Sequence, residues 1–266
     1  MSEMGTAVVT GASSGIGAIY ADRLATRGHD VILVARNADR LAQQADRLAK
    51  RHGVKTRVIA ADLTSPAELR QVEQALKADP SITMLVNNAG FGGAGDLLQS
   101  DVDRMEEMIA VNVTAVMRLS YAVAPAFVVR GAGTIINISS IVAIGPEILN
   151  GVYGGSKAFV LGFSQSLKKE LGERGVKVQV VLPGATATEF WDVAGLPVGN
   201  LPNTWVMTAE NLVDAALLGL DRGEFATIPS LQAGEEWEAY EKARQVMLPH
   251  LSSATVAPRY ALALAS

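Results

Sequence analysis

The chain of 266 residues contains no cysteine. Disulfide bonds, thiolate chemistry and cysteine-based zinc sites are therefore excluded. Histidine is scarce too: His29, His52 and His250 are scattered along the chain, so we expect no metal site. Blocks of one charge are also missing. The formal net charge is −4, and no Lys/Arg run provides an electrostatic basis for binding nucleic acid or an anionic membrane.

Long hydrophobic runs are absent as well. The N-terminus passes almost at once into the apolar run Thr6 to Thr10, without the basic segment and long apolar stretch of a signal peptide. Other apolar runs are short or interrupted, so we expect no membrane span and a soluble, cytoplasmic protein. A content of 49% hydrophobic residues and a mean hydropathy of +0.22 are typical of a well-packed globular protein.

Short apolar runs alternate with longer helical patterns through most of the chain. The runs are rich in Val and Ile and almost uninterrupted, as expected for parallel strands buried on both faces. We predict strands at Ala7 to Thr10, Asp30 to Ala35, Thr56 to Ala61, Met84 to Asn87, Thr134 to Ile138, Lys177 to Leu182 and Ala226 to Ile228. The order predicts an α/β fold, a doubly wound parallel sheet of Rossmann type with about seven strands and helices on both faces.

The intervening segments have helical spacing of apolar residues. We predict helices at Asp39 to Arg51, Pro66 to Lys77, Val102 to Val129 and Val152 to Arg174. No linker divides the chain, so we expect one domain over residues 1–266. After Gly184 the rhythm breaks, and we predict a substrate loop or lid at 189–207 and a C-terminal extension at 230–266. A plain surface insertion is the alternative for the loop.

The first predicted strand ends in a glycine-rich turn, Thr10-Gly11-Ala12-Ser13-Ser14-Gly15-Ile16-Gly17, and helical sequence follows. Glycines permit a tight turn and a close approach of backbone to phosphate, and the helix N-terminus offers free N–H groups. A strand before and a helix after make a dinucleotide site the favoured interpretation over an ordinary turn.

The second predicted strand ends in Val34-Ala35-Arg36-Asn37, where NAD-specific sites commonly carry an acid for the ribose hydroxyls. No acid is present, and Arg36 and Arg40 offer guanidinium groups that suit a 2′-phosphate. We therefore expect NADP(H) to be preferred over NAD(H). A solvated surface arginine is the alternative.

Polar and small residues follow three further strands. Asp62 and Leu63 follow the third, and the Asp62 carboxylate either accepts from an adenine amino group or caps a turn. Asn87-Asn88-Ala89-Gly90 follows the fourth, and Ser139 and Ser140 follow the fifth. Since the carboxyl ends of parallel strands share one edge, we expect these residues to lie along one ligand-binding edge.

Tyr153 and Lys157 are spaced one helical turn apart, so a helix places them on one face. A neighbouring ammonium favours the phenolate and lowers the pKa of a tyrosine, which then exchanges a proton with a carbonyl or alcohol oxygen. Asn112 lies inside a predicted helix, where Asn is unfavourable, which indicates either a function or a kink.

These motifs together resemble the short-chain dehydrogenase/reductases. TGASSGIG at Thr10 to Gly17, NNAG at Asn87 to Gly90, Asn112, Ser140, Tyr153 with Lys157, and Pro183-Gly184 occur in the order and spacing of that family. The match covers roughly Thr6 to Thr188 and is most similar to the reductase branch of about 250 residues. One departure is Gly154-Gly155, since the family often has Ala at the second of these positions.

The resemblance implies a role for each matching residue. Tyr153 is the expected proton donor in reduction, Lys157 lowers its pKa and holds the nicotinamide ribose, Ser140 orients the substrate oxygen, and Asn112 positions a relay water. The expected cofactor-binding residues are Gly11, Ser13, Ser14, Gly15, Ile16, Gly17, Arg36, Asn37, Arg40, Asp62, Leu63, Asn88, Ala89, Gly90, Tyr153, Lys157, Pro183, Gly184, Thr186 and Thr188.

The resemblance also implies an activity. We expect an NADP(H)-dependent oxidoreductase that reduces a fairly apolar ketone or aldehyde, with pocket walls from Ile141, Val142, Leu149, Phe190 and Trp191. The alternatives are an alcohol, steroid or sugar-alcohol dehydrogenase acting in oxidation, or a non-catalytic NADP-binding regulator. The family commonly forms dimers or tetramers through the helices predicted at Val102 to Val129 and Val152 to Arg174.

Overall fold

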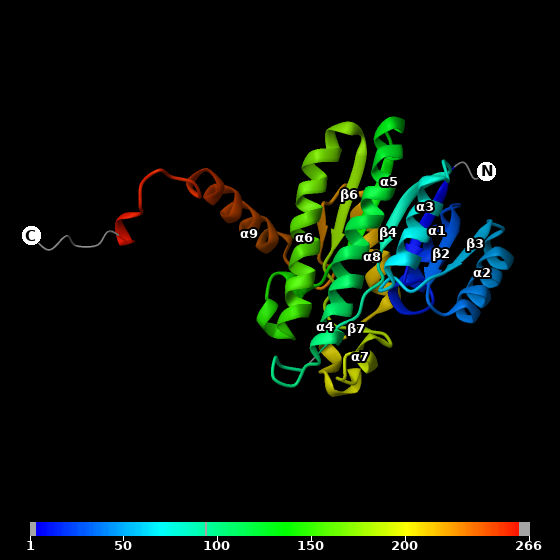
Figure 1. The fold of residues 1–266 in the computed structure, drawn as a ribbon, viewed down its shortest axis with the longest axis horizontal. Coiled ribbons are helices and arrows are strands. Elements are labelled where there is room, and N and C mark those ends of the chain that lie inside the picture. Colours follow the sequence, from blue (N-terminus) through cyan, green and yellow to red (C-terminus); the bar gives the residue numbers. More distant parts are fainter. Residues whose placement is uncertain (1–3, 94, 261–266) are drawn as a thin grey trace, which may run out of the picture. The chain divides into compact units, whose positions relative to one another are not determined.

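The computed structural model describes residues 4–93 and 95–260, which fall into two units, Met1–Ser230 and Leu231–Ser266. The first unit contains a parallel sheet with helices around it (Figure 1). Its seven strands run in the order β3-β2-β1-β4-β5-β6-β9, and every pairing is parallel. The predicted Rossmann-type α/β sheet is thereby confirmed.

The observed strands agree closely with the predicted ones. They are β1 (Thr6–Thr10), β2 (Asp30–Ala35), β3 (Thr56–Ala60), β4 (Ile82–Asn87), β5 (Gly133–Ile138), β6 (Val176–Val181) and β9 (Ala226–Thr227). Five of these strands are almost fully buried, namely β1, β2, β4, β5 and β6. This burial is expected from their nearly uninterrupted apolar sequences.

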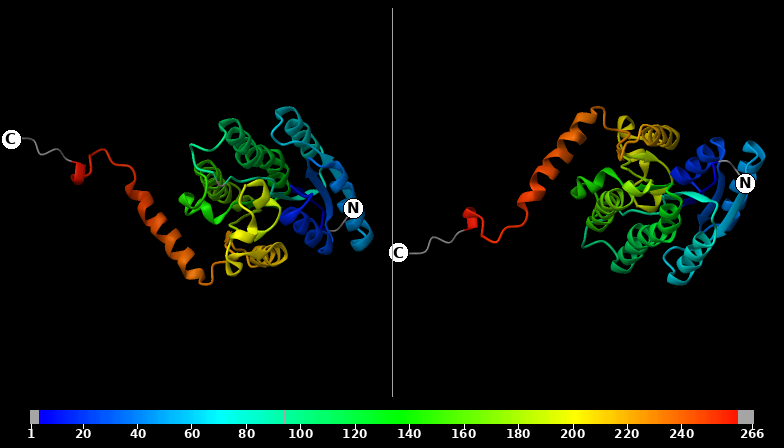
Figure 2. Two further views of the ribbon diagram at one scale, coloured as in Figure 1. Left: turned by 90° about the horizontal axis from the view of Figure 1, so that it is seen from below. Right: turned by 90° about the horizontal axis from the view of Figure 1, so that it is seen from above.

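Helices cover both faces of the sheet (Figure 2). One layer contains α1 (Gly15–Thr26), α2 (Ala38–His52) and α8 (Ala209–Asp221), whose apolar residues share one core cluster with the sheet. The other layer contains α3 (Pro66–Lys77), α5 (Val116–Arg130) and α6 (Gly151–Leu171), which form the second cluster. The sheet is therefore doubly wound, and the strands' carboxyl ends face a common edge.

The helix predicted from Val102 to Val129 is not a uniform α-helix. The structure has α4 (Val102–Ile109), a π-helical segment (Ala110–Ala115) and then α5. This segment, Val102–Arg130, is the one among the described residues that is long and apolar enough to cross a membrane. Half of its most apolar window is buried in the protein, and core helices of globular proteins have the same length and composition.

The segment after Gly184 has secondary structure that the sequence pattern did not predict. A two-stranded parallel ribbon pairs β7 (Thr186–Ala187) with β8 (Met207–Thr208). Between them lie α7 (Phe190–Val193) and two short 3₁₀ turns, Val198–Asn200 and Asn203–Trp205. The ribbon is too short to leave a strand-length apolar run, which explains why periodicity gave no signal.

The second unit contains α9 (Gly234–Met247) and two 3₁₀ turns, Leu248–His250 and Pro258–Tyr260. No described residue of α9 is buried. Trp237 and Tyr240 stack on each other, with ring centroids 5.4 Å apart.

Candidate active site

Tyr153 and Lys157 lie in the first two turns of α6. The helix begins after Asn150, whose side-chain oxygen accepts hydrogen bonds from the backbone N–H groups of Val152 (2.9 Å) and Tyr153 (3.3 Å). This N-cap fixes where the helix starts and therefore where the phenol is placed. Both side chains are buried, with 5% and 6% of their surface exposed. Lys157 Nζ lies 5.9 Å from the Tyr153 ring centroid.

Burial shifts the pKa of both groups. It raises the pKa of Tyr153 to about 12, while a side-chain hydrogen bond with Ser140 acts in the opposite direction. Burial lowers the pKa of Lys157 to about 8. Lys157 Nζ donates to the carbonyl oxygen of Ile138 at 3.0 Å. The expected lowering of the Tyr153 pKa by Lys157 is therefore not what this geometry gives, because desolvation of the phenolate has the larger effect.

Ser140 lies at the carboxyl end of β5, beside this pair. Its hydroxyl accepts from Val142 N (3.3 Å) and donates to the carbonyl oxygen of Pro183 (3.4 Å). Its neighbour Ser139 donates to the backbone carbonyl of Lys157 at 2.8 Å, which ties α6 to the end of the strand. The two serines thus have separate parts: Ser139 anchors the helix and Ser140 lies beside the phenol.

Asn112 occupies the π-helical segment and is completely buried. Its amide exchanges two hydrogen bonds with the backbone of Phe91, at 2.9 and 3.1 Å, and also donates to Ser156 Oγ at 3.1 Å. A Cβ built on Gly90 would lie 2.8 Å from Asn112 Oδ1 and 3.5 Å from Lys157 Nζ. Asn112 therefore joins the loop after β4 to α6 beside Lys157, and the misfit in the helix pattern marks this π-helical turn.

The glycine turn forms a cradle whose close contacts exclude side chains. Gly11 has a φ of +66°, and a Cβ there would lie 2.7 Å from Asn88 Nδ2. A Cβ on Gly17 would collide with the carbonyl group of Gly11. No side chain caps the start of α1 at Ser14. The open turn and the uncapped N–H groups fit the pyrophosphate of a dinucleotide.

Thr10 joins the glycine turn to the end of β4. Its hydroxyl accepts from the backbone N–H groups of Asn88 and Ala89, both at 3.0 Å, and Asn88 Nδ2 donates back to the Thr10 carbonyl at 2.9 Å. Two of the predicted cofactor motifs are therefore one hydrogen-bonded unit. The amide of Asn88 is occupied by this unit, so its role here is to hold the turn.

The residues predicted to bind the adenosine part of the cofactor lie after β2 and β3. Asn37 caps α2 by accepting from Arg40 N at 2.9 Å, and Arg40 pairs with Glu189. Arg36 is exposed. Asp62 Oδ1 accepts from the N–H and the hydroxyl of Thr64, at 2.9 and 2.8 Å, which is the turn-capping role that we held as an alternative.

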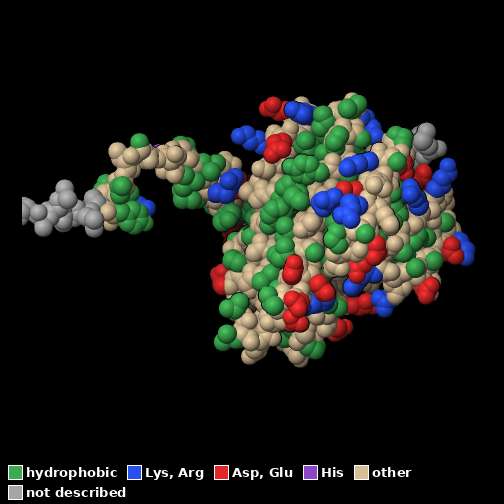
Figure 3. Space-filling view, in the orientation of Figure 1, with side chains coloured by type: hydrophobic (Ala, Val, Ile, Leu, Met, Phe, Trp, Pro, Cys, Tyr) green, Lys and Arg blue, Asp and Glu red, His purple; other side chains and the backbone are tan. Residues whose placement is uncertain are grey.

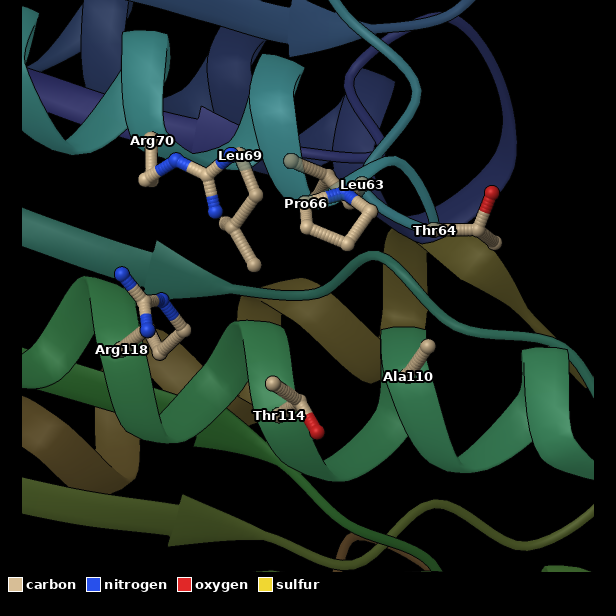
Figure 4. A pocket seen from close by; sticks show the side chains of 8 residues that line it. All are labelled: Leu63, Thr64, Pro66, Leu69, Arg70, Ala110, Thr114 and Arg118. Carbon is tan, nitrogen blue, oxygen red and sulfur yellow. The ribbon is translucent and has the colours of Figure 1, made fainter.

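Leu63 is buried in the core cluster and lines a small pocket on the face of α3 and α5 (Figure 4). The pocket's other lining residues are Thr64, Pro66, Leu69, Arg70, Ala110, Thr114 and Arg118. Arg118 forms an ion pair with Glu73. None of the predicted catalytic residues lines this pocket, so we do not assign it to the substrate.

The remaining predicted cofactor residues form the segment that leaves β6. Pro183 is buried, and its carbonyl oxygen accepts from Ile141 N at 3.0 Å. The Thr186 hydroxyl donates to the carbonyl of Gly184 at 3.1 Å. A Cβ on Gly15 would lie 3.2 Å from the Thr188 methyl group. The segment therefore passes from the end of β5 to the glycine turn, across the carboxyl edge.

Apolar side chains surround the phenol of Tyr153. Of the predicted pocket residues, Val142, Leu149 and Phe190 belong to one cluster with Tyr153, and the Phe190 and Tyr153 ring centroids are 5.7 Å apart. Trp191 is buried and donates to the carbonyl of Thr186 at 2.9 Å, so its indole supports α7. The cluster also contains residues that we did not predict, Phe91, Met105, Met108 and Val152.

Comparisons with known proteins identify the family of the chain. Residues 5–195 match the family model for the short chain dehydrogenases. A short-chain dehydrogenase from Sphingobium yanoikuyae, solved in complex with NADPH, is 48% identical and has a TM-score of 0.94, with 97% of this chain and 100% of that chain covered. The bulky-bulky ketone specific alcohol dehydrogenase from Comamonas testosteroni is 44% identical, with a TM-score of 0.89 and 96% and 98% covered.

A very-long-chain 3-oxoacyl-CoA reductase from Bos taurus is 38% identical over 188 residues, which are 69% of this chain. The chain spans 60% of the length of that relative. From the family match and the fold, the chain belongs to the short-chain dehydrogenase family and is an oxidoreductase of that family.

Proposed function

We propose that the protein is an NADP(H)-dependent reductase of ketones or aldehydes with apolar substituents. The observation that carries the proposal is the placement of Tyr153, with Ser140 and Lys157 beside it, inside an apolar cluster at the strand ends. The glycine cradle lies along the same edge of the sheet. This arrangement lets the cofactor supply the hydride from one side of the substrate carbonyl while Tyr153 supplies the proton from the other.

The chain's own residues account for the proton half of the reaction. Ser140 donates a hydrogen bond to the substrate oxygen and orients the carbonyl toward Tyr153. Tyr153 gives its phenolic proton to that oxygen as negative charge develops on it, and the Lys157 ammonium stabilises the resulting phenolate. NADPH, when bound, supplies the hydride to the carbonyl carbon. A pKa of about 12 keeps Tyr153 protonated at neutral pH, as a proton donor in reduction requires.

The preference for NADPH rests on the absence of an acid after β2 and on two arginines there. Arg36 is exposed, and Arg40 lies in the first turn of α2. A guanidinium matches a phosphate in both charge and geometry. The NADPH complex of the relative from Sphingobium yanoikuyae supports the same preference.

The substrate class follows from the walls around Tyr153. Val142, Leu149, Phe190 and Phe91 offer aliphatic and aromatic surface, so we propose a carbonyl flanked by apolar groups. The bulky-bulky ketone specificity of the Comamonas testosteroni relative supports this assignment, and the 3-oxoacyl-CoA reductase from Bos taurus supports the reduction of a ketone.

We also propose a cytoplasmic homo-oligomer. Large apolar side chains are exposed on the layer of α5 and α6, among them Tyr121 and Val129, which are 67% and 89% exposed, and Phe159. Hydrophobic side chains gather over this face in Figure 3. Such a surface is typical of a subunit contact.

The function is tested by following the oxidation of NADPH and NADH with a panel of ketones. We expect turnover of ketones that carry apolar groups on both sides, with NADPH favoured at least about tenfold in kcat/KM. Small ketones and sugar ketones serve as controls. A preference for NADH, or turnover confined to the polar ketones, contradicts the proposal. NADPH binding without turnover of any ketone identifies the non-catalytic regulator instead.

A further inference from the structure

One ion pair joins the adenosine end of the candidate site to the segment beside Tyr153. Arg40 Nη1 lies 2.8 Å from Glu189 Oε2, although the two residues are 149 positions apart in the chain. Arg40 belongs to the first turn of α2, and Glu189 is the N-cap residue of α7. Both side chains are half-exposed, 50% and 59%, so the pair is accessible to a competing anion.

Glu189 also lies next to two contacts that fix where α7 begins. The preceding residue, Thr188, approaches the glycine turn at Gly15, where a Cβ would lie 3.2 Å from its methyl group. The following residue, Phe190, packs against Gly92 so closely that a Cβ there would collide with the ring. Phe190 also contacts Tyr153. Movement of Glu189 is therefore coupled by the chain to the aromatic wall of the substrate site.

Arg36 differs from Arg40 in this respect. It is exposed and has no ion pair among residues 4–93 and 95–260. Arg36 directly precedes Asn37, the N-cap of α2, and Arg40 lies in the first turn of that helix, so both guanidinium groups belong to the start of α2. We infer that one phosphate binds both. A phosphate dianion offers more charge and more acceptor oxygens to a guanidinium than one carboxylate does. Exposed carboxylate pairs contribute little stability, so such a phosphate displaces Glu189 readily.

We propose that Glu189 is a specificity-determining residue that competes with the 2′-phosphate of NADPH for Arg40. The proposal rests on the NADP preference proposed above. Binding of the 2′-phosphate releases Glu189, because a carboxylate left beside a dianion is repelled by it. NADH has no 2′-phosphate and leaves the pair intact. The cofactor's ribose phosphate thereby controls the start of α7 and, through Phe190, the wall beside Tyr153.

The test measures binding of two fragments by calorimetry, so it needs no catalysis. Adenosine 2′,5′-bisphosphate carries the 2′-phosphate and adenosine 5′-monophosphate lacks it. We expect Glu189→Gln to bind the bisphosphate about three- to tenfold more tightly than the wild type, with the monophosphate unchanged. Asp192→Asn removes an acidic side chain of the same helix that forms no ion pair with Arg40, and it is the matched control. Equal effects of the two variants overturn the proposal.

A second measurement, the fluorescence of Trp191, tests whether binding of the 2′-phosphate is coupled to α7. The chain has three tryptophans, and Trp205→Phe with Trp237→Phe leaves Trp191 in α7 as the reporter. We expect the bisphosphate, and not the monophosphate, to change Trp191 emission. In Glu189→Gln the emission without ligand already resembles that of the bisphosphate complex. Emission that both fragments change alike contradicts a 2′-phosphate switch.

Arginine variants separate this proposal from the one on which it rests. In an Arg40→Ala background, we expect Glu189→Gln to have no further effect on bisphosphate affinity, since the competition is gone. If Arg36→Ala and Arg40→Ala both bind the bisphosphate like the wild type, the 2′-phosphate lies elsewhere and the NADP assignment fails with this one. If they lose at least about tenfold and Glu189→Gln has no effect, only the competition is refuted.

Discussion

The two titratable residues of the candidate site show how burial assigns their roles. Burial raises the pKa of Tyr153 to about 12 and lowers the pKa of Lys157 to about 8, because each group loses water around its charged form. Tyr153 therefore holds its proton across the neutral range. Lys157 is charged below about pH 8 and loses its charge above it. The positive charge that stabilises a phenolate is present only in the lower range.

This difference predicts a pH profile for reduction. The value of kcat/KM for NADPH reports groups of the free enzyme, and we expect it to be level below about pH 7 and to fall above about pH 8 by up to tenfold per unit. The direction follows from the lowered pKa of Lys157, which moves deprotonation down from its usual alkaline range. Lys157→Arg keeps its charge, so its profile stays level to higher pH. A wild-type profile that is level through pH 9.5 contradicts this assignment.

At the residue scale, the sequence motifs predict which side chains meet but not how they are bonded. Ser140 follows β5, and Tyr153 and Lys157 lie in the first turns of α6. Asn112 is joined to α6 by its hydrogen bond to Ser156, so the four residues meet at the carboxyl edge of the sheet. The direction of the Tyr153 pKa shift was not predictable, since desolvation depends on packing by residues such as Met108, far away in the sequence. The Arg40–Glu189 pair carries no sequence signal for the same reason.

At the scale of elements, the start of α6 depends on a close approach that only one of its glycines requires. A Cβ on Gly154 would lie 2.8 Å from both the carbonyl oxygen and the Cβ of Pro146. A Cβ on Gly155 would meet nothing within 4 Å. Gly154 thus permits the 3₁₀ turn Pro146–Ile148 to pack on the helix that carries Tyr153. The departure from the family pattern is at Gly155, and no close contact explains it.

The two glycines give a matched pair of predictions. Gly154→Ala introduces a clash and is expected to lower the free energy of unfolding by about 1–3 kcal/mol. Gly155→Ala adds a better helix former in open space and is expected to raise it by up to about 1 kcal/mol. Urea unfolding of both variants measures the difference. Equal destabilisation by the two substitutions shows that the contact with Pro146 does not govern this helix start.

The elements that were predicted and those that were not differ in length. The Val/Ile runs and the capped helix Pro66–Lys77 carry their signal within one segment, so their bounds were found. The ribbon of β7 and β8 pairs two residues on each side, and α7 has a single turn. Such short elements are stabilised by tertiary contacts, for example the Trp191 hydrogen bond to Thr186, and not by local propensity.

At the scale of the whole molecule, the two helical layers of the sheet differ in their outer surfaces. The layer of α5 exposes Tyr121 and Val129, whereas α8 on the opposite layer exposes Leu218 at 48%. Single exposed apolar residues are common, but a group of them across two helices is typical of an interface. The proposed subunit contact therefore belongs to the layer of α5 and α6.

This difference predicts how substitutions change the oligomeric state. We expect the wild type to be a dimer or tetramer by light scattering and Tyr121→Arg to dissociate it by at least about tenfold in affinity, since a charge would be buried in the contact. Leu218→Arg makes the same change on the other layer and should leave the mass unaltered. A monomeric wild type, or equal effects of both variants, argues against this interface.

We propose that Tyr153 delivers the proton in carbonyl reduction, and Tyr153→Phe is the sharpest test of that role. The substitution removes only the hydroxyl and keeps the ring in its apolar cluster. We expect kcat for an apolar ketone with NADPH to fall by at least about a hundredfold, while NADPH affinity, measured by calorimetry, changes less than about threefold. Nearly full turnover by Tyr153→Phe with intact NADPH binding would show that Tyr153 is not the proton donor.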